Sequence, residues 1–282
     1  MLKKWIAIGA LLGSSMAQAY MPQSGTWVVT SELNGKPGRG LAIDVQGQTL
    51  VMQMYAYDAS GNATFYLTSG AYKNNQYSGT LNKYRGGRYL GSSERIGQEN
   101  GNDGVVSMRF ESGTKGYIRF PGEAEKEISR FSFGYDKSPQ SLYGMWLFTP
   151  LGTSTPRSDV VKLQKLVAGS GYGTGFVTTA DNRFACENVT SGPNAGLVVC
   201  IKFNIADRVE QVYYFDYKVN DGEGYTGTSA ATATNLLIVR RLTTSTDDGT
   251  GITFKSDESA PPADLDALRQ AFEAVVAEPI EQ

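Results

Sequence analysis

The fold is decided by residues 41–80, which read LAIDVQGQTLVMQMYAYDASGNATFYLTSGAYKNNQYSGT. Apolar and polar side chains alternate here in short runs, which is typical of half-buried β-strands. Turn residues separate the runs: Val45–Gln48 is a tight connection, and Asp58–Gly61 has Asp first and Gly fourth, as a type I turn prefers. Asn74 and Asn75 tolerate the positive φ that a tight hairpin turn requires. The stretch therefore predicts antiparallel strands joined by hairpins.

The same pattern, followed outward, predicts eight strands in the first half of the chain. Their expected ranges are 25–31, 39–46, 49–58, 62–72, 75–84, 104–111, 115–121 and 126–134. Eight strands in consecutive hairpins can close into a barrel, which removes exposed sheet edges. We therefore expect an all-β protein with two tandem antiparallel β-barrel or sandwich-like domains of about eight strands each, followed by a short C-terminal helix.

An internal repeat supports two domains. Gly25-Thr26-Trp27 and Gly144-Met145-Trp146 hold the two tryptophans found after residue 19. A second block matches at four positions, pairing Tyr66, Tyr77, Gly79 and Thr80 with Tyr214, Tyr225, Gly227 and Thr228. Coincidence among aromatic strands is the alternative. Duplication predicts one β domain at residues 20–137 and another at 138–258, the second carrying a cysteine hairpin.

The N-terminus has the composition of an export signal. Lys3 and Lys4 precede an apolar stretch from Trp5 to Leu12, and the segment ends in Ala17-Gln18-Ala19. This order predicts a signal peptide over residues 1–19, cleaved after Ala19. The apolar run is about half of the ~20 residues that a spanning helix needs, and no later stretch is a candidate transmembrane helix. The protein is expected to be periplasmic or secreted.

The C-terminal segment, residues 259–282, departs from the strand pattern. Ala260-Pro261-Pro262 interrupts it, and apolar residues then recur at helical spacing: Leu265, Leu268, Phe272 and Val275. Asp264 and Asp266 fall in the first turn, where acidic side chains favour a helix. Two interpretations stay open, a helix docked on a barrel by its apolar stripe and a helix that binds a partner.

The two cysteines, Cys186 and Cys200, are predicted to form a disulfide. An oxidising compartment favours pairing, and the intervening Thr190–Asn194 has turn chemistry that would bring them together across a hairpin. A metal pair is the competing interpretation. It lacks a CxxC spacing, and the chain has no histidine to complete a tetrahedral site.

Composition excludes several functional classes. The chain holds 26 basic and 28 acidic residues, without the basic excess of a nucleic-acid binder. It has no histidine, which removes histidine triads and HExxH zinc sites. Paired carboxylates could still act in a hydrolase, and the candidates are Glu94, Glu99, Asp103 and Glu111. Residues 99–104 could offer oxygen ligands to calcium but lack EF-hand spacing, so no metal or cofactor is expected.

The aromatic strands carry the best remaining functional signal. On the strand at 49–58, Tyr55 and Tyr57 share one face with Val51 and Gln53, and the other face is aliphatic: Leu50, Met52, Met54 and Ala56. We predict a contact surface on the first domain made of Tyr55, Tyr57 and Tyr66, with Arg88 near its rim. Ordinary sheet packing of these tyrosines is the alternative.

Two resemblances bear on this interpretation. A first strand with G-x-W, followed by about seven more strands, resembles the calycin barrels, the lipocalin and avidin group, in which the tryptophan packs at the closed end and the open mouth takes a ligand. Over residues 25–90, Gly38–Leu41, Tyr55–Gly61 and Phe65–Leu67 resemble an uncharacterised exported bacterial β module. Related copies often have tryptophan where this chain has Phe65. This second resemblance implies a compartment and a fold but no activity.

Together these features predict an exported, non-catalytic binding protein. The ligand could be a protein, a glycan or a small apolar molecule, and a periplasmic inhibitor or protection factor is one specific form of this hypothesis. A carboxylate-based hydrolase and a structural component of the cell envelope are the alternatives. The sequence does not determine the oligomeric state.

Overall fold

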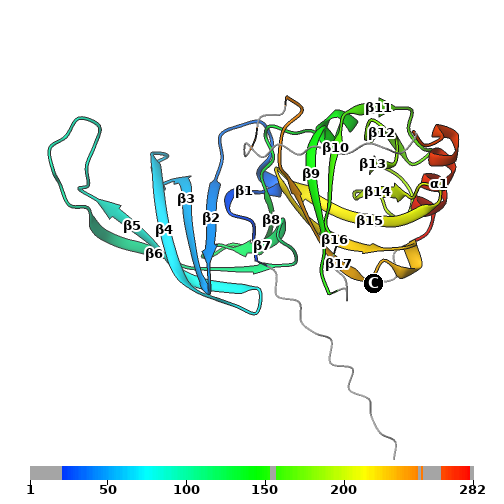
Figure 1. The fold of residues 1–282 in the computed structure, drawn as a ribbon. Coiled ribbons are helices and arrows are strands. Elements are labelled where there is room, and N and C mark those ends of the chain that lie inside the picture. Colours follow the sequence, from blue (N-terminus) through cyan, green and yellow to red (C-terminus); the bar gives the residue numbers. More distant parts are fainter. Residues whose placement is uncertain (1–20, 153–156, 247–248, 250–261, 280–282) are drawn as a thin grey trace, which may run out of the picture.

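The structure, a computed structural model, describes residues 21–152, 157–246, 249 and 262–279. It consists of two antiparallel β bodies in tandem and one α-helix (Figure 1). The predicted signal peptide and its cleavage point after Ala19 lie outside the described residues. Among the described residues, no helix is long and apolar enough to cross a membrane.

The first body is a closed barrel in which each strand pairs with its neighbours in sequence order. Its strands are β1 (Gly25–Val29), β2 (Gly40–Gln46), β3 (Thr49–Tyr57), β4 (Ala63–Lys73), β5 (Gln76–Arg85), β6 (Gln98–Phe110), β7 (Lys115–Arg119) and β8 (Lys126–Arg130), with a short 3-10 helix, η1 (Thr30–Glu32), after β1. The barrel closes through β1 and β8, where Trp27 lies opposite Arg130. The expected eight-stranded hairpin architecture is therefore confirmed.

One strand boundary differs clearly from the expectation. β6 begins at Gln98, whereas the sequence predicted a start at 104. The extra residues pair with the end of β5 across two register shifts, so that Asn102 lies opposite Asn82 and Glu99 opposite Tyr84. Irregular pairing of this kind leaves no clean alternation in the sequence. As a result, β5 and β6 form a long arm that extends away from the second body (Figure 1).

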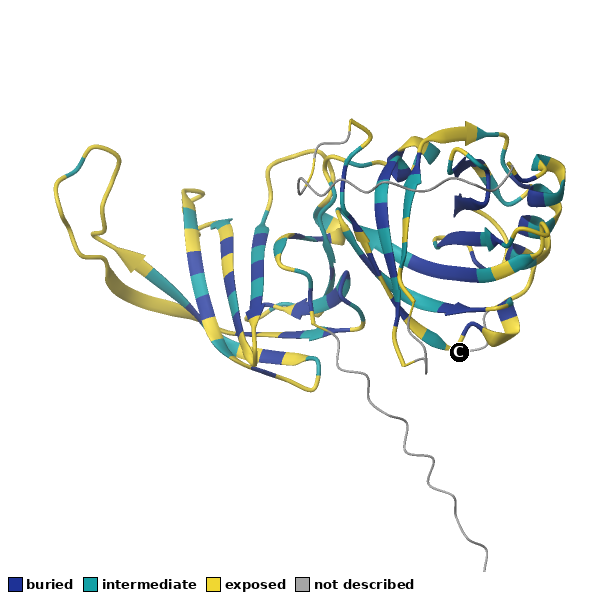
Figure 2. Cartoon of the chain, in the orientation of Figure 1, coloured by how far each residue is buried: buried dark blue, intermediate teal, exposed yellow. Residues whose placement is uncertain are grey.

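Aromatic rings fill the first barrel. Trp27 meets Phe110 edge-on at 5.5 Å between ring centroids, and Tyr72 meets Phe110 at 5.9 Å. Along β3, buried and exposed residues alternate as predicted (Figure 2), and the aliphatic side chains of Leu50, Met52 and Met54 belong to this core.

An ion-pair network ties the end of the first barrel together. The Arg39 guanidinium contacts the carboxylates of Glu32 and Glu123, the latter at 2.7 Å, and Lys126 contacts both acids. A hydrogen bond from Arg39, and to a smaller extent one from Lys126, lowers the pKa of Glu123 to about 2. Glu123 is therefore a carboxylate whose ionised form stabilises the fold.

The second body is a nine-stranded sheet that curls on itself. Its strands are β9 (Gly144–Pro150), β10 (Asp159–Leu163), β11 (Lys165–Val167), β12 (Gly173–Thr178), β13 (Phe184–Val189), β14 (Val198–Phe203), β15 (Val209–Lys218), β16 (Asp221–Gly227) and β17 (Asn235–Arg241), with 3-10 helices η2 (Pro139–Leu142) and η3 (Ala230–Thr232). Only Gln164 separates β10, which pairs with β9, from β11, which pairs with β12. One bent strand thus joins the two sheet edges, and the body forms a barrel.

The two barrels share a local signature at their first strands. The Trp27 indole donates to the Gln23 carbonyl at 2.9 Å, and the Trp146 indole donates to the Leu142 carbonyl at 2.8 Å, each four residues back. An arginine on the last strand lies opposite each tryptophan, Arg241 opposite Trp146 as Arg130 is opposite Trp27. The G-x-W triplets therefore occupy equivalent places.

The second block of the proposed repeat does not align in this way. Tyr66 lies on β4 and Tyr77 on β5, the fourth and fifth strands of the first barrel. Tyr214 and Tyr225 lie on β15 and β16, which are the sixth and seventh strands of the second barrel when β10 and β11 count as one. The matched block thus falls two strands later in the second barrel, directly after the cysteine hairpin of β13 and β14.

The predicted disulfide is present. Cys186 on β13 and Cys200 on β14 are directly opposite each other in the antiparallel pair, and their sulfurs are bonded. Both side chains lie in the core of the second barrel with Trp146 and Phe148. The bond therefore closes the β13–β14 hairpin from inside the barrel.

The predicted helix is α1 (Leu265–Ala277), and it docks on the second barrel. Asp264 caps its first turn by accepting from the Asp266 backbone N–H. Phe272 packs against Phe176 on the outer face of the sheet, with ring centroids 4.5 Å apart. The apolar stripe is thus buried within the chain, which favours the docked interpretation over a partner-binding helix.

Candidate ligand-binding surface

The first barrel presents exposed tyrosines on β3. Alternation along this strand directs Met52 and Met54 inward, so Tyr55 and Tyr57 point outward. Tyr55 is 58% and Tyr57 51% exposed. Both tyrosines therefore occupy the face opposite the aliphatic one, as predicted, and neither is a core residue.

Neighbouring strands extend this face into a row of aromatic rings. Phe65 on β4 lies directly opposite Tyr55, and the Phe65 ring is stacked with that of Tyr84 on β5, at 6.4 Å between centroids and 8° between ring planes. Phe65 is 49% and Tyr84 37% exposed. We call Tyr55, Phe65 and Tyr84 the aromatic row. It crosses three adjacent strands on the outside of the barrel.

A second line of side chains runs beside the aromatic row. Gln53 pairs across β4 with Leu67, Leu67 with Asn82 on β5, and Asn82 with Asn102 on β6. Gln53, Leu67 and Asn82 are each two residues away from the member of the aromatic row on the same strand. They therefore lie on the same outer face as the aromatic row. We call Gln53, Asn82 and Asn102 the amide row. Within the described part of the chain, the amides of Gln53 and Asn82 make no side-chain hydrogen bond.

Tyr66 does not belong to this surface, which corrects the prediction that grouped it with Tyr55 and Tyr57. It follows Phe65 on β4 and therefore points to the opposite face, into the barrel, where it is only 6% exposed. Its hydroxyl donates to the Asp103 carboxylate at 2.6 Å, and Lys83 pairs with the same acid. This hydrogen bond and burial raise the pKa of Tyr66 to about 12. The residue supports the surface from beneath.

Arg88 is exposed in the connection between β5 and β6, four residues beyond Tyr84. It lies past the end of the aromatic row, on the arm. The same connection exposes Tyr89, Leu90 and Ile96. The arm therefore adds apolar and cationic groups next to the surface. Among Arg88, Tyr89, Leu90 and Ile96, only Arg88 was predicted to lie near the surface.

The candidate carboxylates do not converge. Glu94 lies in the arm connection and Glu99 faces outward opposite Tyr84, whereas Asp103 is held by Lys83 and Tyr66. Glu111 follows the far end of β6, eight residues and thus about 26 Å from Asp103 along an extended strand. The lysine and tyrosine contacts of Asp103 lower its pKa. Asp103 and Glu111 are too far apart to act as the carboxylate pair of a hydrolase.

The chain matches no protein-family model, no curated protein and no solved structure. The candidate surface is therefore defined by its geometry alone. Within the described ranges, no three acidic or cysteine side chains come together as a metal-binding group.

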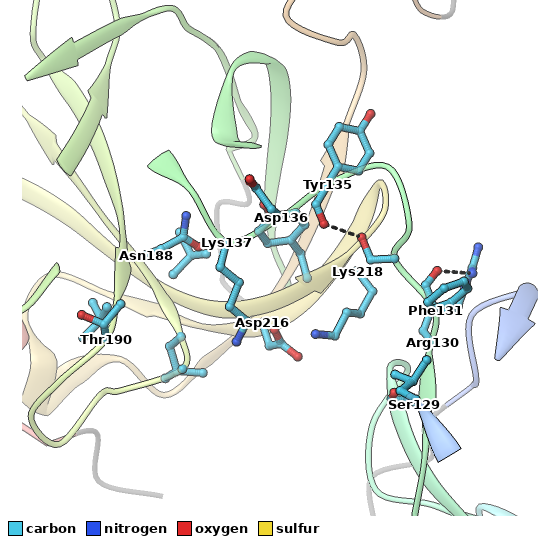
Figure 3. Close-up of a pocket in the computed structure, with 17 residues that line it drawn as sticks. Ser129, Arg130, Phe131, Tyr135, Asp136, Lys137, Asn188, Thr190, Asp216 and Lys218 are labelled. Carbon is cyan, nitrogen blue, oxygen red and sulfur yellow. Dashed lines mark hydrogen bonds between the residues drawn. The ribbon is translucent and has the colours of Figure 1, made fainter. Parts of the chain in front are cut away.

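Several hollows were not predicted from the sequence, among them one between the barrels and one at an end of the second barrel. The hollow between the barrels has a volume of about 280 Å³, and its lining includes Arg130, Lys137, Asp216 and Lys218 (Figure 3). The Arg130 guanidinium donates to the Phe131 carbonyl there at 3.1 Å. Residues from both barrels and from their connection line this hollow. No local sequence pattern could have indicated that they meet.

The other hollow, of about 610 Å³, is at the end of the second barrel remote from Trp146. Lys202 pairs with Asp159 at 2.7 Å, and the buried Tyr213 hydroxyl donates to the same carboxylate. Burial raises the pKa of Tyr213. Lys202 is also close to Glu210, so the charges of Lys202, Asp159 and Glu210 are shared within this mouth. The exposed aromatic row, with the amides of Gln53 and Asn82 beside it, makes the first barrel the stronger candidate for binding.

Proposed function

We propose that this protein is an exported binding protein that contacts its ligand through the aromatic row and the neighbouring Tyr57. One observation carries the proposal: aromatic side chains from three adjacent strands lie exposed in a line, with no described element packed over them. Large aromatic surfaces of this kind mark interaction sites, because their burial by a partner releases water from a broad apolar area.

Export is supported by two features. The order of charged, apolar and small residues at the N-terminus is that of a signal peptide. The disulfide between Cys186 and Cys200 is a feature of proteins in oxidising compartments. Both features favour the periplasm or the exterior of the cell as the place where the surface meets its ligand.

Binding is favoured over catalysis by the same geometry. Exposed rings and neutral amides supply contact area and hydrogen bonds but no acid, base or nucleophile. The candidate carboxylates are dispersed, and Asp103 is held ionised by its neighbours. Neither the hydrolase nor the structural alternative has an observation of comparable weight.

The experiment is a capture from an envelope extract of the organism that encodes the protein. Immobilised wild-type protein, Phe65→Ala and Ile205→Ala are compared, because Ile205 is 83% exposed on the second barrel and is a matched apolar control. We expect a component that wild type and Ile205→Ala retain and that Phe65→Ala loses, since interface aromatics contribute about 1–2 kcal/mol or more. Equal retention by all three proteins would overturn the proposal.

A further inference from the structure

We propose that the ligand of this surface is a neutral polysaccharide that lies along the aromatic and amide rows. This inference rests on the proposed function and specifies its ligand class. Three features of the surface support it: the shape of the rows, their hydrogen-bonding groups and the placement of charge around them.

The aromatic row has the dimensions of an extended chain rather than of a compact patch. Adjacent strands are about 4.8 Å apart, so Tyr55, Phe65 and Tyr84 span about 10 Å across the sheet. The Phe65 and Tyr84 rings are nearly parallel and stacked, so each turns one face toward the other and leaves its outer face and its edge for a linear ligand. The C–H groups of a pyranose ring carry partial positive charge, and the negative face of an aromatic quadrupole attracts them.

The amide row supplies what the hydroxyl groups of such a chain require. Gln53 and Asn82 each have two N–H donors and a carbonyl acceptor, and a sugar hydroxyl both donates and accepts. The two rows are two residues apart along the strands, about 6.6 Å. A sugar chain could therefore place its C–H surface on the rings and its hydroxyl edge on the amides. A purely apolar ligand would leave those amides unsatisfied.

The charge distribution favours a neutral polymer. The two rows themselves carry no charge. Beside them, Glu99 lies opposite Tyr84, and the exposed Arg85 and Arg88 on the same arm offset its charge. Lys83 adds no free charge, because it is paired with Asp103 on the inner side of the strands. Neither sign of charge predominates, so a charged polymer would gain little over a neutral one.

The probe is the polysaccharide fraction of the same envelope extract, digested exhaustively with protease and separated by ion exchange into neutral and acidic polymers. Binding is measured by retardation of the protein in affinity electrophoresis. We expect the neutral fraction to retard the protein, and periodate oxidation, which cleaves vicinal diols, to abolish the effect. Phe65→Ala should weaken binding about tenfold and Asn82→Ala about threefold, with Ile205→Ala unchanged.

The outcomes separate this inference from the proposed function. If the neutral fraction does not retard the protein, or Phe65→Ala leaves retardation unchanged, the polysaccharide inference is wrong. If envelope capture still depends on Phe65 but is destroyed by protease and survives periodate, the binding function stands and the ligand is a protein. A cooperative unfolding transition with its midpoint well above the temperature of the binding assay shows that the exposed variants remain folded.

Discussion

Phe65 and Tyr66 are adjacent in sequence, and the structure predicts opposite consequences when each is replaced by alanine. Tyr66 is buried, and truncating a buried aromatic costs about 3–5 kcal/mol of stability. Phe65 is about half exposed, so its truncation removes roughly half the burial of a large apolar side chain, about 1 kcal/mol. Its contact with Tyr84 adds about 0.5–1 kcal/mol. The two variants should therefore differ by at least about 1 kcal/mol.

Urea unfolding followed by tryptophan fluorescence measures this difference. A shared Trp146→Phe background makes Trp27 the reporter, so that the transition follows the first barrel. Tyr66→Phe removes only the hydroxyl that donates to Asp103 and should cost about 1–3 kcal/mol, less than the alanine variant. Equal losses for the two alanine variants, or a larger loss for Phe65→Ala, would refute the assignment of the inner and outer faces of β4.

Three further predictions concern the rest of the chain. Replacing Cys186 and Cys200 by serine should cost about 3 kcal/mol, measured as a shift in the unfolding midpoint, and an unchanged midpoint would contradict it. The pKa of Glu123 is lowered from 4.5 to about 2, so the stabilisation by its ionised carboxylate is fully present above pH 4.5 and is lost as the pH falls toward 2. Urea unfolding across this range should show that the free energy of unfolding declines less steeply with falling pH in Glu123→Gln than in wild type. An equally steep decline in the variant would argue against this role of Glu123. Phe272→Ala should cost about 3–5 kcal/mol and speed hydrogen exchange in α1, whereas unaltered exchange would mean that the helix is held elsewhere.

Local sequence signals predicted most of the first barrel because its turns are encoded by adjacent residues. The hairpin at Asp58–Gly61 is an example: the Asp58 carboxylate accepts from the backbone N–H groups of Ser60 and Asn62, which fixes the connection between β3 and β4. Asn74 and Asn75 have positive φ in the next turn, as expected. The helical spacing of Leu268 and Phe272 likewise follows from short-range periodicity.

The direction of Tyr66 could not be obtained in this way. The inner face of β4 carries Tyr66, Thr68 and Tyr72, whereas the outer face carries Phe65 and Leu67. By polarity alone the outer set looks more like a core than the inner set does. The inversion is stabilised by distant groups, since Tyr66 finds its acceptor in Asp103 and Thr68 exchanges a hydrogen bond with Tyr77. Neither contact is visible to a local pattern.

Other features depend on strand pairing that the sequence does not specify. The stacking of Phe65 on Tyr84 requires the register set at the Asn74-Asn75 turn, where Lys73 lies opposite Gln76, to continue unshifted past Leu67 and Asn82. Glu187 is a buried acid on β13 whose carboxylate accepts from Ser170 and from the Gly175 backbone N–H, and burial raises its pKa. Its acceptor role depends on a loop folded back over the sheet.

Hydroxyl-radical footprinting of the whole protein, with and without the envelope extract, tests the binding surface most directly, because it works with an unidentified ligand. We predict that Tyr55, Phe65 and Tyr84 become protected in the extract, while Ile205, which is exposed on the second barrel, oxidises at an unchanged rate. Protection elsewhere on the molecule, with unchanged oxidation of Tyr55 and Phe65, would contradict the proposal that this face binds the ligand.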